Sequence, residues 1–231
     1  MFRMVRADGC SAVHGEYAPE PCASRNHAKK KSFKPIEQDR QDVQEKRRIF
    51  EKTLANIEPE RLVFIDESGC NIAMTMAHAR APAGERVAEK RPTNWGQNIT
   101  IVGAIRPDRV LCHQVLQGSM NKVRFIDFVE NTLCPRLEAG NVVILDNLRA
   151  HHATEVRMAI EKRGAEVIYQ PPYSPEYNPI ELCWSFIKGW LRRLAKRTEV
   201  ELRRAIRTTF LRVKTAQLKA WFAHCGWHHS K

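Results

Sequence analysis

The sequence predicts an α/β fold in which a mixed five-stranded sheet is flanked by helices on both faces. Three observations favour this class. Short apolar runs typical of buried strands alternate with longer amphipathic segments over residues 59–213. The first three runs follow one another without a helix between them, which indicates an antiparallel meander. The later runs are separated by helix-like segments, which indicates parallel crossovers.

The strand-like runs are short, apolar and bounded by turn residues. We expect strands at residues 61–66, 98–105, 109–116, 141–146 and 165–170. The first and the fourth have the same ending, VFID and VILD, so that each closes on an aspartate. The Gly- and Pro-containing stretch at 67–97 predicts a hairpin or an irregular insertion.

The helix-like segments differ in character. Residues 35–58 are rich in charge and predict a largely exposed linker helix. Residues 121–137 carry an apolar stripe that includes Val123, and residues 152–163 end at Gly164, a good C-terminal stop. A helix follows the proline-rich PPYSPEYNP, and another covers about 199–213. We therefore divide the chain into an arm without hydrophobic period at 1–34, the linker helix at 35–58 and one main domain at 59–231.

Composition limits the function classes. The 231 residues include 38 Lys and Arg against 26 Asp and Glu, which gives a net charge of +12 and favours a polyanionic partner such as nucleic acid. No apolar run approaches the roughly 20 residues of a membrane span, and the first residues lack the apolar stretch of a signal peptide. Seven cysteines without a C-x-x-C pair argue against a disulfide framework or a cysteine zinc site.

Three carboxylates form the candidate site. Asp66 and Asp146 end two strands, and active sites of open sheets lie at the carboxyl ends of strands. Adjacent carboxylates repel each other unless a cation lies between them, and oxygen ligands suit Mg²⁺ or Mn²⁺. Asn178 is a good N-cap and Pro179 fits the first helical position, so Glu181 falls at the third. Each of these residues also has an ordinary structural explanation as a turn or cap residue, so local physics leaves both readings open.

At the level of motifs, the sequence resembles the transposases of the DDE superfamily, specifically the bacterial insertion-sequence group related to mariner elements. The resemblance lies in LVFIDESGCN with Asp66, VVILDNLRAHH with Asp146 and PPYSPEYNPIELCW with Glu181. Thirty-four residues separate Asp146 from Glu181, which is the D-x34-E spacing of this group. The family fold is ribonuclease-H-like, in agreement with the order of elements inferred above.

The resemblance implies a function and its partners. Asp66, Asp146 and Glu181 would be the catalytic, metal-binding triad and would hold two Mg²⁺ or Mn²⁺ ions for DNA strand cleavage and strand transfer. The partners would be DNA, as transposon ends and target, and a second copy of the chain in a homodimer on DNA. The protein would act in the bacterial cytoplasm, associated with the nucleoid, and not on a membrane.

Residues beside the triad have weaker predicted roles. Glu67, Asn147 and His151 are candidates for positions behind the metal ligands or for orienting the substrate. The segment between residues 186 and 214 contains ten basic residues and only two glutamates, which favours phosphate contacts near the site. The candidates for the DNA backbone are Lys188, Arg192, Arg193, Lys196 and Arg197. Trp184 is interpreted as packing.

Two alternatives stay open. Transposases of this group carry helix-turn-helix modules before the catalytic domain, and the segment before Lys30 is too short to match them. A truncated remnant that binds DNA without cleaving it is therefore an alternative. Another ribonuclease-H-like nuclease is the second.

Overall fold

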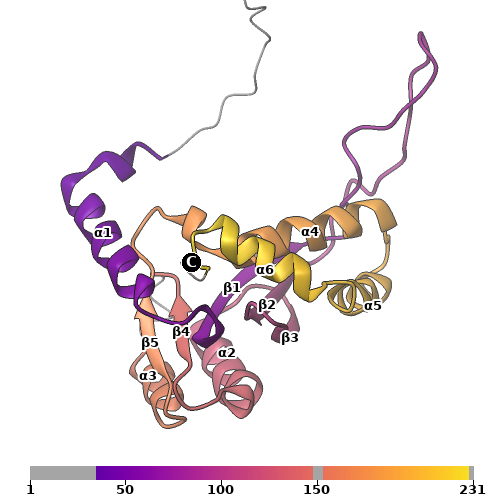
Figure 1. Cartoon of the computed structure of the whole chain (residues 1–231). Helices are drawn as coiled ribbons and strands as arrows, with labels where there is room; N and C mark the ends of the chain where they lie inside the picture. The colour runs from indigo at the N-terminus through magenta and orange to yellow at the C-terminus, as the bar shows by residue number, and fades with distance from the viewer. Residues whose placement is uncertain (1–34, 148–152, 229–231) are drawn as a thin grey trace, which may run out of the picture. The chain divides into compact units, whose positions relative to one another are not determined.

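A five-stranded sheet of order β3-β2-β1-β4-β5 forms the centre of the computed structural model, which describes residues 35–147 and 153–228 (Figure 1). Its strands are β1 (Leu62–Cys70), β2 (Ile99–Ile105), β3 (Val110–Gln117), β4 (Val142–Leu145) and β5 (Glu166–Tyr169). β1, β2 and β3 pair antiparallel, whereas β4 pairs parallel with both β1 and β5. The predicted mixed sheet is confirmed.

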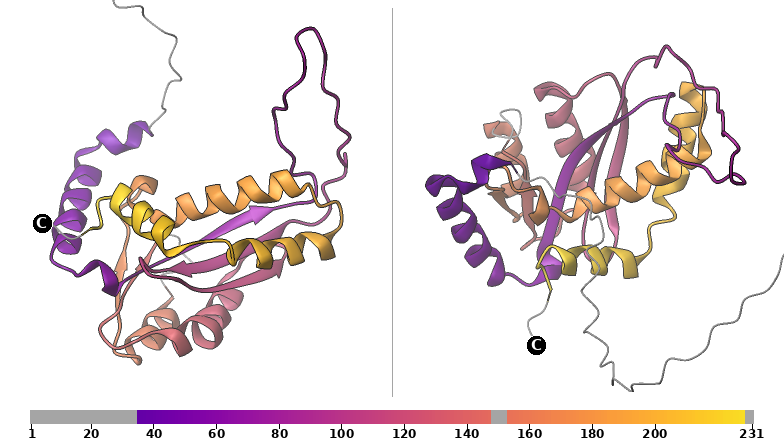
Figure 2. Two further views of the ribbon diagram at one scale, coloured as in Figure 1. Left: turned by 45° about the vertical axis from the view of Figure 1, so that its right-hand side comes forward. Right: turned by 90° about the horizontal axis from the view of Figure 1, so that it is seen from above.

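Helices cover both faces of this sheet. α4 (Pro179–Leu194), α5 (Glu199–Phe210) and α6 (Thr215–His224) lie on one face, and α2 (Lys122–Asp127) and α3 (Thr154–Glu161) lie on the other (Figure 2). Side chains of β1 alternate between the two faces of the sheet, so this strand packs against both helical layers. Leu62 and Phe64 belong to the apolar cluster under α4, α5 and α6, whereas Val63 and Ile65 belong to the cluster with α2 and α3. Side chains of even number in β1 therefore point toward α4.

The linker segment forms a short 3-10 turn at Ile36–Asp39 followed by α1 (Gln41–Ala55). Val43, Phe50 and Leu54 are the buried residues of α1, and its other residues are half-buried or exposed. Phe50 and Leu54 join the same apolar cluster as α4. α1 is thus attached to the main domain along one narrow apolar stripe.

Strand β1 is longer than the sequence predicts. It continues past Asp66 to Cys70, because Asp66 to Cys70 pair with Gly103 to Ile99 of β2. The aspartate therefore lies in the middle of a strand, and the prediction that β1 ends there is wrong. Polar residues in the second half of the strand hid this continuation, since cross-strand pairing with β2 and not apolarity defines it.

The segment predicted as one helix at 121–137 changes its winding. α2 is followed by a π-helical stretch at Phe128–Leu133 and a 3-10 turn at Cys134–Arg136. Phe125, Phe128, Val129 and Leu133 are fully buried, whereas Val123 is 75% exposed, so its place in the predicted apolar stripe is wrong. The wider π turn shifts which side chains face the sheet.

Residues 71–98 form the predicted irregular insertion, all of it described and without helix or strand. The segment leaves the body as two extended arms near the end of α4 (Figures 1 and 2). Arg197 holds its base, since its guanidinium donates to the carbonyl oxygens of Ile72 and Met74 and to Glu89, each at 3.1 Å. Within the described residues, no helix is long and apolar enough to cross a membrane.

Candidate active site

Asp66 and Asp146 come from neighbouring parallel strands. Leu62 pairs with Val142 and Phe64 with Ile144, so the same register continued by two residues places Asp66 beside Asp146. Both residues have even numbers, like the residues of β1 and β4 that face α4. The two carboxylates therefore lie on the same face of the sheet.

Glu181 reaches this face from α4. Asn178 caps the helix, with its side-chain oxygen accepting from the backbone N–H of Ile180, and Pro179 occupies the first helical position. Glu181 therefore lies in the first turn, as predicted. The preceding proline-rich loop at 171–178 fixes where this turn begins.

The three carboxylates line one pocket of about 470 Å³. Asn147 and Gln170 also line it, and residues of the proline-rich loop form the rest of its wall. Gln170 follows β5 directly, and its backbone N–H donates to the carbonyl of Leu145 at 2.8 Å. The carboxyl ends of β4 and β5, the middle of β1 and the start of α4 thus meet at one place.

The electrostatics of the pocket are dominated by like charges. Burial, together with the negative charges of Glu181 and Asp146, raises the pKa of Asp66 to about 7. The backbone amide of Glu67 and the indole of Trp184 donate to the Asp66 carboxylate and act in the opposite direction. A site of this kind favours binding of a cation.

The donor set fits a hard divalent cation, because it consists of carboxylate oxygens with an amide oxygen of Asn147 on the same wall. The side chains do not converge as they stand: among the described residues, no three His, Cys, Asp or Glu side chains form a ready cluster for a metal ion. Like charges hold carboxylates apart. Rotation of their side chains toward a shared cation would therefore be part of binding.

Trp184 connects two of the elements that form the pocket. It lies one turn after Glu181 on α4, is 2% exposed, and donates its indole N–H to Asp66 Oδ2 at 2.9 Å. The interpretation of Trp184 as packing was incomplete. The i, i+3 spacing from Glu181 was the available signal, because it places both side chains toward the same side of the helix.

The family model for "DDE superfamily endonuclease" matches residues 61–202, which is more than half of the chain. The chain belongs to the DDE superfamily of endonucleases. All three carboxylates lie inside the matched region. A search of curated protein sequences finds no match.

Solved structures of Mos1 transposase share the fold. A Mos1 paired-end complex with the left transposon end superposes with a TM-score of 0.71 at 17% identity, over 87% of this chain and 63% of that chain. The Mos1 mariner paired-end complex with Mn gives the same score and identity. The Mos1 mariner catalytic domain gives 0.56 at 13% identity, over 83% of this chain and 90% of that chain. The chain thus has the ribonuclease-H-like fold expected for a DDE superfamily catalytic domain, and it spans about 63% of the length of the longer Mos1 chains.

The other predicted site residues are distributed around the DDE pocket. Asn147 is exposed and lines it. Glu67 belongs to the opposite face of β1 by the pleat, and it contributes its backbone amide to Asp66. His151 lies outside the described residues. Sequence reasoning missed Gln170, whose buried side-chain Nε2 has no hydrogen-bond partner among the described residues.

The five basic candidates fall into two groups. Lys196 lies 3.9 Å from Glu201, and Arg197 holds the base of the insertion at 71–98 and Glu89, so both have partners in the fold. Arg193 is exposed and its guanidinium lies over the ring of Trp190, 5.5 Å from the centroid. Lys188 is half-buried and Arg192 is exposed. Lys188, Arg192 and Arg193 form the second group and remain available to contact phosphate.

The proline-rich loop is held from outside by α1. Arg47 donates to Ser174 Oγ and to Glu176, both at 2.7 Å, and its guanidinium lies 4.5 Å from the ring centroid of Tyr177. The carbonyl of Tyr173, whose φ is +55°, accepts from Gln38 Nε2 at 2.5 Å. The linker helix thereby fixes the loop from which Glu181 emerges.

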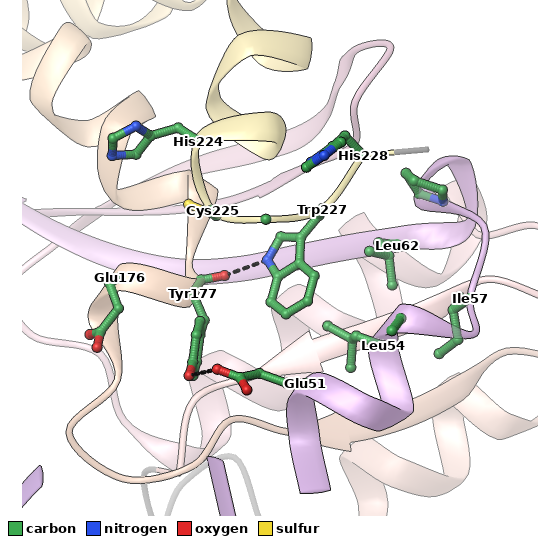
Figure 3. Close-up of a pocket in the computed structure, with 13 residues that line it drawn as sticks. Glu51, Leu54, Ile57, Leu62, Glu176, Tyr177, His224, Cys225, Trp227 and His228 are labelled. Carbon is green, nitrogen blue, oxygen red and sulfur yellow. Dashed lines mark hydrogen bonds between the residues drawn. The ribbon is translucent and has the colours of Figure 1, made fainter. Parts of the chain in front are cut away.

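A second pocket of about 510 Å³ lies between α1 and the end of the chain (Figure 3). Tyr177 donates its hydroxyl to Glu51, and Trp227 donates its indole N–H to the carbonyl of Tyr177 at 2.7 Å. His224 and His228 lie on its rim in Figure 3. Glu51, Tyr177 and Trp227 are joined by these two hydrogen bonds, so we describe this pocket as a structural junction.

Proposed function

We propose that this chain is a transposase catalytic domain that cleaves DNA strands and joins the freed 3′ ends to target DNA. The observation that carries the proposal is that Asp66, Asp146 and Glu181, one from each motif, line a single pocket. Membership in the DDE superfamily and the fold shared with Mos1 transposase support it.

Asp66, Asp146 and Glu181 would hold two divalent ions, Mg²⁺ or Mn²⁺. When bound, such ions lower the pKa of an attacking water or 3′-hydroxyl and stabilise charge on the leaving oxygen. The role of this chain's residues would be to hold the ions, through the three carboxylates, where the scissile phosphate binds. No side-chain general base is required, so the same pocket would serve both hydrolysis and strand transfer.

The basic surface of α4, α5 and α6 supports DNA as the partner. In the described part of the chain, a set of cations on these helices and the turn between them has no carboxylate within ion-pair distance. The set is Lys188, Arg192, Arg193, Arg204, Arg207, Arg212, Lys214 and Lys219. Arg212 and Arg193 cover the ring of Trp190 beside a groove of about 530 Å³. Cations without internal partners are available to neutralise phosphates.

A third pocket, next to the one with the three carboxylates, extends the proposed DNA path. About 290 Å³ in volume, it shares Asn147, Gln170 and two prolines with the carboxylate pocket and is bordered by exposed Lys46 of α1. A strand bound at the carboxylates would continue along this groove. Joining two transposon ends requires that they be held together, so we include a homodimer on DNA, acting at the bacterial nucleoid, in the proposal.

The test is nicking of supercoiled plasmid in Mn²⁺. We expect the wild type to nick and Asp146→Asn to fail. Glu166→Gln is the matched control, because Glu166 is an exposed carboxylate at the opposite end of β5 from the pocket. A plasmid is suitable because it does not require recognition of terminal repeats.

Three other outcomes would contradict the proposal. Equal nicking by Asp146→Asn and wild type would remove the triad from the chemistry. Salt-sensitive DNA binding without nicking by any form would indicate a remnant that only binds DNA. Cleavage of RNA–DNA hybrid in preference to duplex DNA would indicate another ribonuclease-H-like nuclease.

A further inference from the structure

The side chain of Trp184 bonds directly to a carboxylate of the proposed triad. An indole can only donate, through a single N–H, so its position specifies one oxygen of its partner. Here that oxygen is Asp66 Oδ2 at 2.9 Å. The backbone amide of Glu67 donates to the same carboxylate, so two donors from the fold orient Asp66.

The indole is held from several sides. Its ring lies edge-on to Phe210 of α5, with centroids 6.1 Å apart and planes at 86°. Its other neighbour is Gly103 of β2, which pairs directly with Asp66 in the sheet register. A Cβ on Gly103 would lie 3.0 Å from Trp184 Cη2, a contact so tight that the ring would have to move by a few tenths of an ångström. The absence of a side chain at position 103 therefore leaves room for the indole in the position from which it reaches Asp66.

The bond from Trp184 to Asp66 connects two elements of the site, because Trp184 lies on the same helix as Glu181. Trp184 and Glu181 are on the same face of α4, one turn apart, so the bond to Asp66 joins the helix that carries Glu181 to the strand that carries Asp66. Apolar packing between α4 and the sheet also connects these two elements, but it does not fix the orientation of a carboxylate.

We propose that Trp184, seated on Gly103, is a positioning residue that orients Asp66 and sets its place relative to Glu181 for divalent-metal binding. The inference rests on the proposed function, because it assigns the pocket a metal. Groups that orient a metal ligand typically change metal affinity or activity by about 10- to 100-fold when they are removed.

The test measures Mn²⁺ binding directly, by the electron paramagnetic resonance signal of free Mn²⁺, together with plasmid nicking as a function of Mn²⁺ concentration. Trp184→Phe keeps most of the ring and removes the N–H. Its matched control is Trp227→Phe, since Trp227 is also buried and donates one indole N–H, at 2.7 Å to the carbonyl of Tyr177 (Figure 3). Both variants lose one buried hydrogen bond, so their melting temperatures should fall by similar amounts.

We expect Trp184→Phe to bind Mn²⁺ about tenfold more weakly and to need correspondingly more Mn²⁺ for nicking, with most of the rate recovered at saturating metal. Trp227→Phe should bind Mn²⁺ within about twofold of the wild type. A role in packing alone would lower the melting temperature of both and leave the Mn²⁺ affinity of both unchanged, which would overturn the inference.

A second pair of variants keeps the test independent of the folding of Trp184→Phe. Gly103→Ala keeps the tryptophan at position 184 but shifts its ring. It should therefore also weaken Mn²⁺ binding. Gly69→Ala is the control, because the added Cβ on this strand glycine meets only the flexible side chain of Asn98, at 3.1 Å. Equal Mn²⁺ affinity of Gly103→Ala and Gly69→Ala would contradict the positioning role.

The two proposals fail in different ways. Wild-type protein that binds and uses Mn²⁺, beside a Trp184→Phe variant that does so equally well, leaves the proposed function intact and rejects the role of Trp184. Wild-type protein that neither binds Mn²⁺ nor nicks DNA rejects both.

Discussion

The proline-rich loop lines two pockets that are alike in size but differ in how their charges are compensated. The pocket with Asp66, Asp146 and Glu181 measures about 470 Å³, and the pocket under α1 about 510 Å³. Both hold acidic side chains, and beside each a buried tryptophan N–H donates to an oxygen. Pocket size alone would therefore select the wrong one.

The difference lies in the partners of the carboxylates. Under α1, Glu51 accepts from the Tyr177 hydroxyl and Glu176 forms an ion pair with Arg47 at 2.7 Å. In the other pocket the neighbours of Asp66 include two further carboxylates, and their charges help to raise its pKa. Carboxylates compensated by a cation or a hydroxyl within the fold stabilise it, whereas carboxylates whose neighbouring charges are other carboxylates favour binding of a cation.

The largest expected effect is on the nicking rate, and it should differ between two glutamates that lie five residues apart. Glu181→Gln should reduce the rate of plasmid nicking by about three orders of magnitude, because charge stabilisation by a bound metal contributes several kcal/mol. Glu176→Gln, on the other side of the loop, should stay within a few-fold of the wild type. Single-turnover nicking rates at saturating Mn²⁺ measure both. Comparable losses in the two variants would show that the loop, and not the Glu181 carboxylate, is what matters.

The second prediction concerns how firmly α1 holds the loop. Arg47→Met should lower the free energy of unfolding by about 2 kcal/mol, because hydrogen bonds from a charged group to Ser174 and Glu176 are lost. Nicking should also fall, since the loop that presents Glu181 becomes less restrained. Urea denaturation measures the stability.

Arg48→Met is the control for Arg47. Arg48 is exposed and, within the part of the chain that the structure describes, pairs only with Glu45 of its own helix, at 2.6 Å, so its loss should change stability by less than about 0.5 kcal/mol. Equal destabilisation by the two substitutions would mean that the bonds from Arg47 to the loop stabilise the fold no more than a surface ion pair does.

Much of this arrangement was predictable from the sequence, for identifiable reasons. β4 ends at Leu145 directly before Asp146, and the N-cap of α4 follows from Asn178 and Pro179, because local rules of apolarity and capping decide both. The extension of β1 beyond Asp66 was not predictable, since it depends on pairing with β2 some 30 residues later. The bonds from Trp184 to Asp66 and from Arg47 to Ser174 join residues more than 100 positions apart, and no local pattern encodes them.

The same distinction between compensated and uncompensated charge applies to the arginines. Arg193→Gln should weaken DNA binding and reduce the slope of log affinity against log salt by about 1, because one phosphate contact is lost. Arg197→Gln should leave that slope unchanged and instead loosen the insertion at 71–98, whose base it holds. Salt-dependent fluorescence anisotropy and limited proteolysis separate the two effects. A reduced slope for Arg197→Gln alone would reverse the assignment.

The smallest effect should come from Tyr177, at the structural junction of Figure 3. Burial and the hydrogen bond to Glu51 raise the pKa of Tyr177 to about 12, whereas an unfolded chain has a tyrosine pKa near 10. The folded state thus disfavours the charged form, so the stability that Tyr177 contributes is complete below about pH 10 and decreases as the pH rises toward 12. Tyr177→Phe should be less stable than the wild type by about 1 kcal/mol at pH 8, with this gap narrowing above pH 10.

Urea unfolding of both proteins at pH 8 and pH 11 tests this, with Tyr173→Phe as a control because that ring is 46% exposed. Nicking at pH 8 should be unchanged in Tyr177→Phe, since the bond to Glu51 lies on the side of the loop away from the carboxylates. A constant stability gap across this pH range would show that the Tyr177 hydroxyl gains nothing from Glu51. A large loss of nicking at pH 8 would show instead that the two sides of the loop are coupled, and the pocket under α1 would then belong to the active site as well.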